Sequence, residues 1–171
     1  GVLIQTAGLL QSQAQSTGQE TTSEVSDLVK INNIVGYETS NFPSLGASVE
    51  NNQITHLNVS VGLASGSDPV NLSEASYAIE TSSNATFVNG NPTAQKGITF
   101  YREQSLKPDA TILSEQDDVM IVQFNLTKIE GIDPLEENGK LKLILNSPAG
   151  SQSTKAVDAP NKIEKGRSYI L

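Results

Sequence analysis

The spacing of apolar residues changes near Ile31, and this change divides the chain into two parts. Before Ile31 the larger apolar side chains recur every three or four residues, which is the period of one face of an α-helix. This stripe consists of Leu3, Ile4, Ala7, Leu9, Leu10 and Ala14. After Ile31 apolar and polar residues alternate, which is the period of a β-strand. We therefore predict a mainly β protein, with an N-terminal α-helix over residues 1–31 followed by a β domain over residues 32–171.

The predicted helix begins with an uncharged stretch. Its first charged residue is Glu20, and the chain opens at Gly1 without an initiator methionine or a helix-capping residue. No apolar run reaches the ~18 residues that a membrane-spanning helix needs. Because apolar surface is stabilised by burial at roughly 25 cal/mol per Å², this stretch needs a partner surface. We expect it to be the second half of a longer hydrophobic helix that packs among other helices.

Nine segments of the β domain are predicted to be strands. Three alternate clearly: His56–Leu63, Val119–Leu126 and Lys140–Leu145. Six are weaker: Ile31–Glu38, Ala75–Thr81, Ala85–Val88, Ile98–Arg102, Thr154–Val157 and Ser168–Leu171. Clusters of Gly, Pro, Asn and Asp separate many of them and predict turns. Short strands at this spacing are typical of an antiparallel β-sandwich.

The composition gives little support to catalysis. The chain has no cysteine, which excludes disulfides and Cys/His zinc sites, and its single histidine is His56. The sequence contains no nucleophile elbow, phosphate-binding loop or dinucleotide-binding motif. His56 lies on the face opposite the stripe that begins at Leu57, so we predict that it is a solvated surface residue. We predict a protein that is not an enzyme and requires no cofactor.

The polar residues of this chain are mostly uncharged. Lys and Arg number 11 against 19 Asp and Glu, and the net charge of −8 argues against binding to nucleic acid or to anionic membranes. Ser, Thr, Asn and Gln supply about a third of the residues, whereas charged residues supply only 18%. A surface made polar by hydroxyls and amides favours a secreted protein over a cytosolic enzyme.

Asn-x-Ser/Thr sequons add to this secreted character. They begin at Asn58, Asn71, Asn84 and Asn125. A chain this rich in Asn, Ser and Thr contains about two sequons by chance. Asn58 and Asn125 occupy outward positions of predicted strands, and the other two lie in turn-rich segments. We predict that at least two of the four carry an N-glycan.

One acidic segment is a candidate site for a structural Ca²⁺ or Mg²⁺. Its members are Asp109, Glu115, Asp117 and Asp118, and hard cations are bound where several oxygens converge on a loop. The alternative interpretation is a solvated acidic loop before a strand. Asp68 is a second candidate, although an Asp before a Pro is usually a turn former.

Several segments of the chain resemble archaeal flagellins (archaellins). Gly1–Gln11 and Glu20–Val25 are similar to the second half of the long N-terminal helix of that family, and Ile31–Tyr37 to its entry into the first strand. Ala64–Leu72 and Leu113–Leu126 resemble two further segments of the family, in the β domain. The N-terminal segments are specific, and those of the β domain are weaker.

The resemblance implies a structural subunit of the archaellum, the rotating swimming filament of archaea. It implies an immunoglobulin-like antiparallel β-sandwich outside, often with N-glycans and in some members with a metal ion, and a helix that bundles with copies of itself in a helical filament. Other archaellins are further expected partners. It also implies type IV pilin-like assembly outside the cell. A preceding segment, absent from this sequence and cut by a prepilin-type peptidase in its natural form, is expected to insert in the membrane before assembly.

Two other functions are compatible with the residues alone. An archaeal type IV adhesion pilin shares the plan of a helix followed by a domain. A secreted ligand-binding β-sandwich module belongs to a different class, and the aromatic content of 5% weighs against a sugar-binding version of it.

Overall fold

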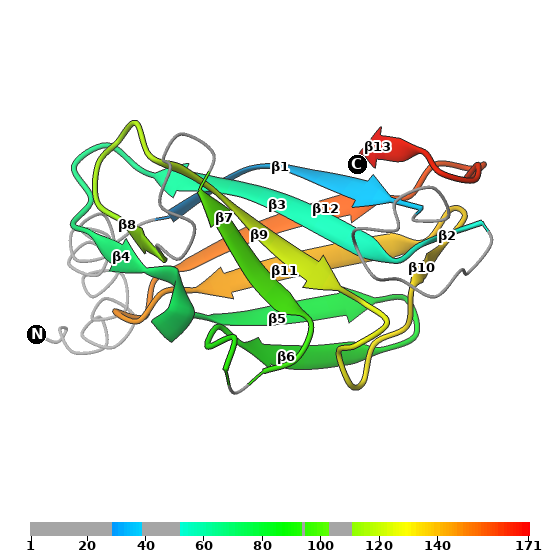
Figure 1. The fold of residues 1–171 in the computed structure, drawn as a ribbon, viewed down its shortest axis with the longest axis horizontal. Coiled ribbons are helices and arrows are strands. Elements are labelled where there is room, and N and C mark those ends of the chain that lie inside the picture. The colour runs from blue at the N-terminus through cyan, green and yellow to red at the C-terminus, as the bar shows by residue number, and fades with distance from the viewer. Residues whose placement is uncertain (1–28, 39–51, 94, 103–110) are drawn as a thin grey trace, which may run out of the picture.

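The computed structural model describes residues 29–38, 52–93, 95–102 and 111–171. These residues form two antiparallel sheets that pack face to face, and a short two-stranded ribbon lies at each end of the pair (Figure 1). The larger sheet has five strands in the order β13-β1-β3-β9-β7, and the smaller has four in the order β12-β11-β5-β6. The arrangement is a β-sandwich.

The sandwich strands have the following bounds. The five-stranded sheet contains β1 (Val29–Tyr37), β3 (His56–Leu63), β7 (Ile98–Arg102), β9 (Val119–Asn125) and β13 (Ser168–Ile170). The four-stranded sheet contains β5 (Ser76–Thr81), β6 (Ala85–Asn89), β11 (Lys140–Asn146) and β12 (Gln152–Asp158). All nine strands predicted from alternation are therefore confirmed.

The two ribbons consist of strands too short to show alternation, and they were not predicted. One pairs β4 (Val70–Asn71) with β8 (Ile112–Leu113). The short 3-10 helix η4 (Leu72–Glu74) directly follows β4. The other pairs β2 (Gln53–Ile54) with β10 (Leu135–Glu136). We call the corresponding regions of the sandwich the β4–β8 end and the β2–β10 end; they lie at the left and the right of Figure 1.

The start of β1 revises the boundary of the predicted helix. Val29 is buried and pairs with Leu63 of β3, so the last three residues assigned to the helix belong to a strand. Residues 1–28, which include the whole predicted apolar stripe of Leu3, Ile4, Ala7, Leu9, Leu10 and Ala14, lie outside the described residues. The helix stays a prediction. No helix in the described part of the chain is long and apolar enough to cross a membrane.

The core lies between the two sheets and follows the predicted alternation. Leu57, Val59 and Val61 of β3 are buried in it, as are Leu141, Leu143 and Leu145 of β11. Across the core, the rings of Tyr77 on β5 and Phe124 on β9 meet edge to face, with centroids 5.3 Å apart and planes at 71°. This is the geometry that the quadrupoles of two aromatic rings favour.

Candidate assembly and modification sites

An apolar groove of about 360 Å³ opens at the β4–β8 end. Its walls are the β4–β8 ribbon on one side and the turn between β11 and β12 on the other. The apolar side chains that line it are Pro69, Val70, Ile112, Pro148 and Ala149. Ile112 is 46% exposed, so part of its aliphatic side chain faces the groove or solvent. We call this feature the end groove.

Hydrogen bonds hold both walls of the end groove in place. On the ribbon side, the side-chain oxygen of Asn71 accepts from the Ser73 backbone N–H (3.1 Å), the Ser73 hydroxyl (2.8 Å) and the Thr111 hydroxyl (2.8 Å). On the turn side, the Ser147 N–H donates to the Ser151 carbonyl (2.8 Å), and the two serine hydroxyls lie 2.7 Å apart in a buried position. The groove is therefore a preformed surface.

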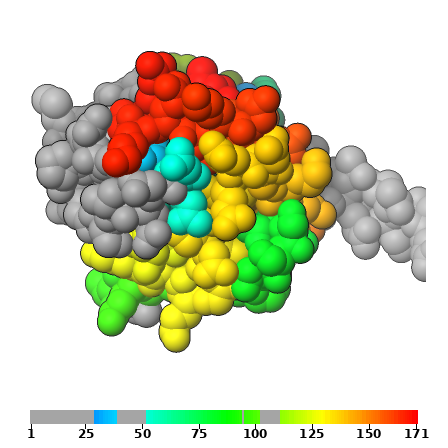
Figure 2. Space-filling model, turned by 90° about the vertical axis from the view of Figure 1, so that its right-hand side faces the viewer, coloured from blue at the N-terminus to red at the C-terminus, as the bar shows by residue number. Residues whose placement is uncertain are grey.

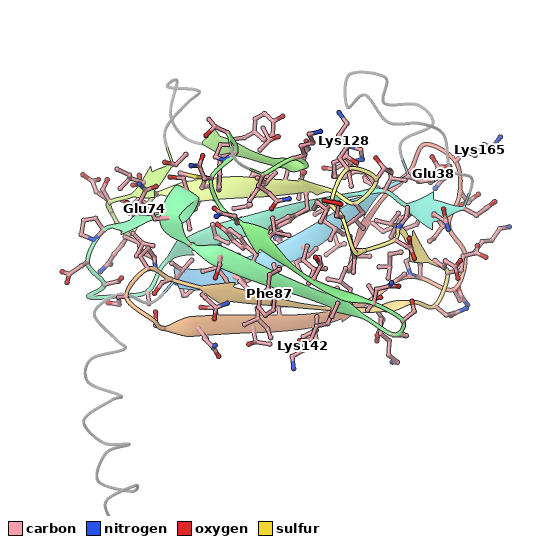
Figure 3. All side chains as sticks on the ribbon, turned by 90° about the horizontal axis from the view of Figure 1, so that it is seen from below. Glu38, Glu74, Phe87, Lys128, Lys142 and Lys165 are labelled. Atoms are coloured by element: carbon pink, nitrogen blue, oxygen red, sulfur yellow. The ribbon has the colours of Figure 1, made fainter. Side chains whose placement is uncertain are left out.

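The one charged residue that lines the end groove is acidic. Glu74 lines it and lies at the β4–β8 end in Figure 3, far from Lys165 at the other end. Asp68 precedes the ribbon, and Glu115, Asp117 and Asp118 follow it. The residues that line the groove include no Lys or Arg, whereas Lys30 of β1 and Arg102 of β7 belong to the same end of the sandwich. The lining of the groove therefore carries one negative charge, that of Glu74.

The acidic segment proposed as a metal site forms a closed turn. One oxygen of Asp118 accepts hydrogen bonds from the Ser114 N–H (2.9 Å), the Ser114 hydroxyl (3.1 Å) and the Glu115 N–H (3.0 Å). Glu115 and Asp117 are exposed, and Asp109 lies outside the described residues. Across the described ranges, no three His, Asp or Glu side chains are grouped closely enough to hold a metal ion. Metal binding by Asp117 and Asp118 stays a prediction.

The sequons at Asn71 and Asn125 adopt the same local geometry. As at Asn71, the side-chain oxygen of Asn125 accepts from the N–H (3.1 Å) and the hydroxyl (2.6 Å) of the residue two positions later, Thr127. Asn91 and Thr93 repeat this arrangement at 3.0 and 2.8 Å, but Pro92 between them removes the sequon. Asn125 is buried, and Asn71 is half-buried in the wall of the end groove.

The sequons at Asn58 and Asn84 differ in how their side chains are held. Asn58 lies in the centre of the five-stranded sheet, where its amide nitrogen donates to the Tyr37 hydroxyl (3.3 Å) and its oxygen accepts from Gln123 (2.8 Å). Asn84 lies in the turn between β5 and β6, where its backbone carbonyl accepts from the Thr81 N–H (2.7 Å). Asn84 therefore stands on a hairpin turn, whereas Asn58 belongs to a ladder of polar side chains.

The prediction that His56 is a solvated surface residue is wrong. The residue is only 1% exposed, and its Nδ1 lies 3.1 Å from the Thr55 hydroxyl. His56 stands between Tyr37 of β1 and Asn125 of β9, beside a polar pocket of about 190 Å³ that Gln123 and Lys128 also line. Alternation identified the inward face of β3, but it does not reveal what covers the outward face of a central strand.

The β2–β10 end is polar where the β4–β8 end is apolar. A cavity of about 170 Å³ there is lined by Asp133, Glu136, Glu137 and Lys140, among others. In Figure 2 the C-terminal segment (red), the loop before β11 (yellow) and the β5–β6 turn (green) come together at this end. The sequence reasoning missed Glu38, which is buried here and accepts from the Gly166 N–H (3.3 Å). Nothing in the local pattern of β1 distinguishes it from an exposed strand terminus.

These features define a β-sandwich protein. Its described surface carries an apolar groove and sequons, which are candidate sites for protein contact and glycosylation. The sequence model of the archaeal-type flagellin family matches residues 1–156. The chain belongs to that family. Family membership does not favour the two alternatives, an adhesion pilin and a secreted ligand-binding module.

Individual relatives match this chain in sequence, and solved structures match it in fold. Flagellin B1 of Natrialba magadii is 29% identical over 94% of this chain and 79% of its own length. Flagellin B2 of Halobacterium salinarum is 25% identical over 100% of this chain and 83% of its own length. The crystal structure of flagellin FlaB1 from Methanocaldococcus jannaschii is similar with a TM-score of 0.65, at 10% identity, over 84% of this chain and 95% of that one. The structure of the archaeal flagellum of Methanospirillum hungatei is similar with a TM-score of 0.58, at 13% identity, over 99% of this chain and 87% of that one.

Proposed function

We propose that this chain is a structural, non-enzymatic subunit that self-assembles into the extracellular archaellum filament used for swimming. The observation that carries the proposal is the family match over residues 1–156, because it spans both the uncharged N-terminal stretch and most of the sandwich. In this proposal an N-terminal helix bundles with its copies in the filament centre. The sandwich, of immunoglobulin-like type, faces outward.

The physical basis of assembly is the burial of uncharged apolar surface between copies. Large side chains such as Leu3, Leu9 and Leu10 each contribute ~1.5–3 kcal/mol when they are fully buried. A stretch without charge places no unpaired ion in the filament interior, where such an ion costs several kcal/mol. When contacts between different surfaces of successive copies do not close into a ring, they generate a helical filament.

The test replaces both Leu3 and Leu10 by Asp in the filament-forming protein. We expect the double variant to form no filaments in electron micrographs, while the sandwich keeps its β-type circular dichroism and its melting temperature. The matched control is Phe87→Asp/Ile170→Asp, which places the same two charges on exposed apolar residues of the edge strands β6 and β13. Normal filaments from the Leu3→Asp/Leu10→Asp variant would overturn the proposal.

We further propose that Asn84 is the first of the four sequons to be glycosylated. Support comes from its hairpin-turn position, whereas a glycan on Asn58 would break the bond to Tyr37 and one on Asn125 would emerge from a buried side chain. Mass spectrometry of peptides from filaments isolated from the host should find a glycan on Asn84. Asn91, which has the same turn geometry as Asn71 but is followed by Pro92, serves as the internal negative control. A modified Asn58 beside an unmodified Asn84 would reverse this order.

A further inference from the structure

We propose that the end groove binds the uncharged stretch, residues 1–19, of a neighbouring copy of this chain. This inference rests on the proposed function and names one of the contacts by which copies associate. The groove brings together five apolar side chains from three separate segments, and it is concave and braced on both sides by hydrogen bonds. A preformed apolar surface of this kind binds an apolar partner without the cost of ordering itself.

The other exposed apolar side chains of the described residues differ from the end groove. Phe87 of the edge strand β6 is 78% exposed, Tyr101 of β7 is 47% exposed and Ile170 of β13 is 82% exposed, but the residues that line the end groove include none of them. Single exposed apolar residues are common on soluble proteins. A concave cluster that includes a half-exposed Ile112 points to a docking surface.

Charge selects which part of the N-terminal region suits the groove. Glu74 is the one charged residue among those that line it, and Asp68 precedes the lining residue Pro69. Residues 20–28 contain three acids and no base, so Glu74 repels them. Residues 1–19 contain no charge and include Leu3, Leu9 and Leu10. They are the apolar segment that Glu74 does not repel.

Distance indicates that the occupant comes from another copy. β1 begins at Val29 at the β4–β8 end, so the same chain's residues 20–28 separate its own leucines from the groove. A helix rises 1.5 Å per residue, so the predicted helix would carry Leu10 about 28 Å from Val29. A neighbouring copy that is displaced along the filament can place its own residues 1–19 beside this groove. The groove and the stretch are different surfaces, so the contact is heterologous, which is the type of contact that an open helical filament repeats.

The first experiment uses the absence of native cysteine. Filaments are assembled from two co-expressed forms, one with Ala149→Cys in the groove and one with a single cysteine replacing Leu3, Leu9 or Leu10, and are then oxidised. Disulfides form only when the Cβ atoms approach to about 3.5–4.5 Å. We expect at least one pair to give a cross-linked dimer in denaturing gels, in about tenfold excess over the control pair with Phe87→Cys in place of Ala149→Cys. Filaments in which no pair exceeds this control would overturn the inference.

The second experiment measures assembly. Ala149→Asp and Ile112→Asp add charge to the groove, and Phe87→Asp and Ile170→Asp add the same charge elsewhere; Ala149 is an exposed turn residue, so its variant retains the fold. We expect about a tenfold fall in filament yield for the groove variants, equivalent to about 1.4 kcal/mol, and less than about twofold for the controls. Equal yields from all four variants would overturn the inference while leaving the proposed function intact. If the parent protein also formed no filaments, the proposed function itself would fail.

The inference also concerns Asn71, which lines the groove and begins a sequon. A glycan at this position would compete with the docked stretch for the same space. We therefore expect Asn71 to be unmodified in assembled filaments. Mass spectrometry that finds Asn71 glycosylated throughout isolated filaments would contradict the docking.

Discussion

The two ends of the sandwich are built alike and present opposite surfaces. Each is closed by a two-stranded ribbon whose inward residue is buried, Leu113 at the β4–β8 end and Leu135 at the β2–β10 end. Beside the ribbon, one end exposes an apolar groove whose one charged lining residue is Glu74, and the other a polar cavity lined with both acidic residues and Lys140. The same architectural element therefore supports a surface suited to protein contact at one end and a solvated surface at the other.

The ends also differ in how their loops are fixed. At the β4–β8 end, many side chains bond to neighbours close in sequence, as Asp118 does to Ser114, although Thr111 also bonds to the distant Asn71. At the β2–β10 end, distant segments are joined: the Ile163 N–H donates to Glu137 (2.8 Å), and Asn52 donates to the Ile163 carbonyl (2.6 Å). Figure 3 shows Lys165 and Glu38 at this end, and Lys142 on the side of the molecule opposite Lys128. Local bonding makes the β4–β8 loops compact, whereas the β2–β10 end depends on the C-terminal segment.

The largest expected change in stability tests whether both ribbons contribute equally to the hydrophobic core. We expect Leu113→Ala and Leu135→Ala each to lower the free energy of unfolding by about 2–5 kcal/mol, because each removes a buried side chain and leaves a cavity. Urea unfolding of the two variants and the parent measures this. A loss below about 1 kcal/mol at one end only would show that its ribbon is an appendage, and the structural equivalence of the two ends would not hold.

The next effect is specific to the β4–β8 end. The Tyr77 hydroxyl donates to the Leu72 carbonyl (3.0 Å), and burial raises the pKa of Tyr77 well above its ordinary value. Tyr77→Phe removes this donor, but the Ala75 N–H still bonds to the same carbonyl (3.3 Å), so we expect a loss of about 0.5–1.5 kcal/mol at pH 7.

The pH dependence follows from the direction of that shift. Folding favours the protonated Tyr77 hydroxyl. Its contribution to the free energy of unfolding is therefore fully present below about pH 10, the pKa of tyrosine in the unfolded chain, and is lost as the pH rises above that value. The parent should therefore lose more stability than Tyr77→Phe between pH 9 and pH 11, values chosen to bracket that pKa at about one unit on each side. Parallel pH profiles for the two proteins would show that Tyr77 does not titrate with unfolding.

The sequence predicted the sandwich but not its ends. Alternation in His56–Leu63 and Lys140–Leu145 identifies strands because one face of each packs on the core. The ribbons have two residues per strand, too few to show a period. The end groove combines residues near positions 70, 112 and 149, and no local pattern reveals that these segments meet. The uncharged stretch was visible in the sequence, whereas the groove proposed to bind it was not.

An effect of similar size separates a capped turn from a metal site at the β4–β8 end. Asp118 accepts three hydrogen bonds and Asp117 is exposed, so we expect Asp118→Ala to cost about 1–2 kcal/mol and Asp117→Ala less than about 0.5 kcal/mol. Melting curves with and without calcium complete the test. If these two residues hold a cation, a calcium-dependent rise in melting temperature disappears in the Asp117→Ala/Asp118→Ala variant. An unchanged rise places any calcium site elsewhere.

The smallest effect concerns the solvated β2–β10 end. The Lys140 ammonium and the Asp158 carboxylate are 3.3 Å apart, with their side chains 75% and 69% exposed. Water and salt screen a pair this exposed, so we expect Lys140→Ala to change the free energy of unfolding by less than about 0.5 kcal/mol. A double-mutant cycle with Asp158→Ala isolates the pair. A coupling above about 1 kcal/mol that persists in 1 M salt would mean that this end is less solvated than its exposure indicates, and it would remove the main contrast with the β4–β8 end.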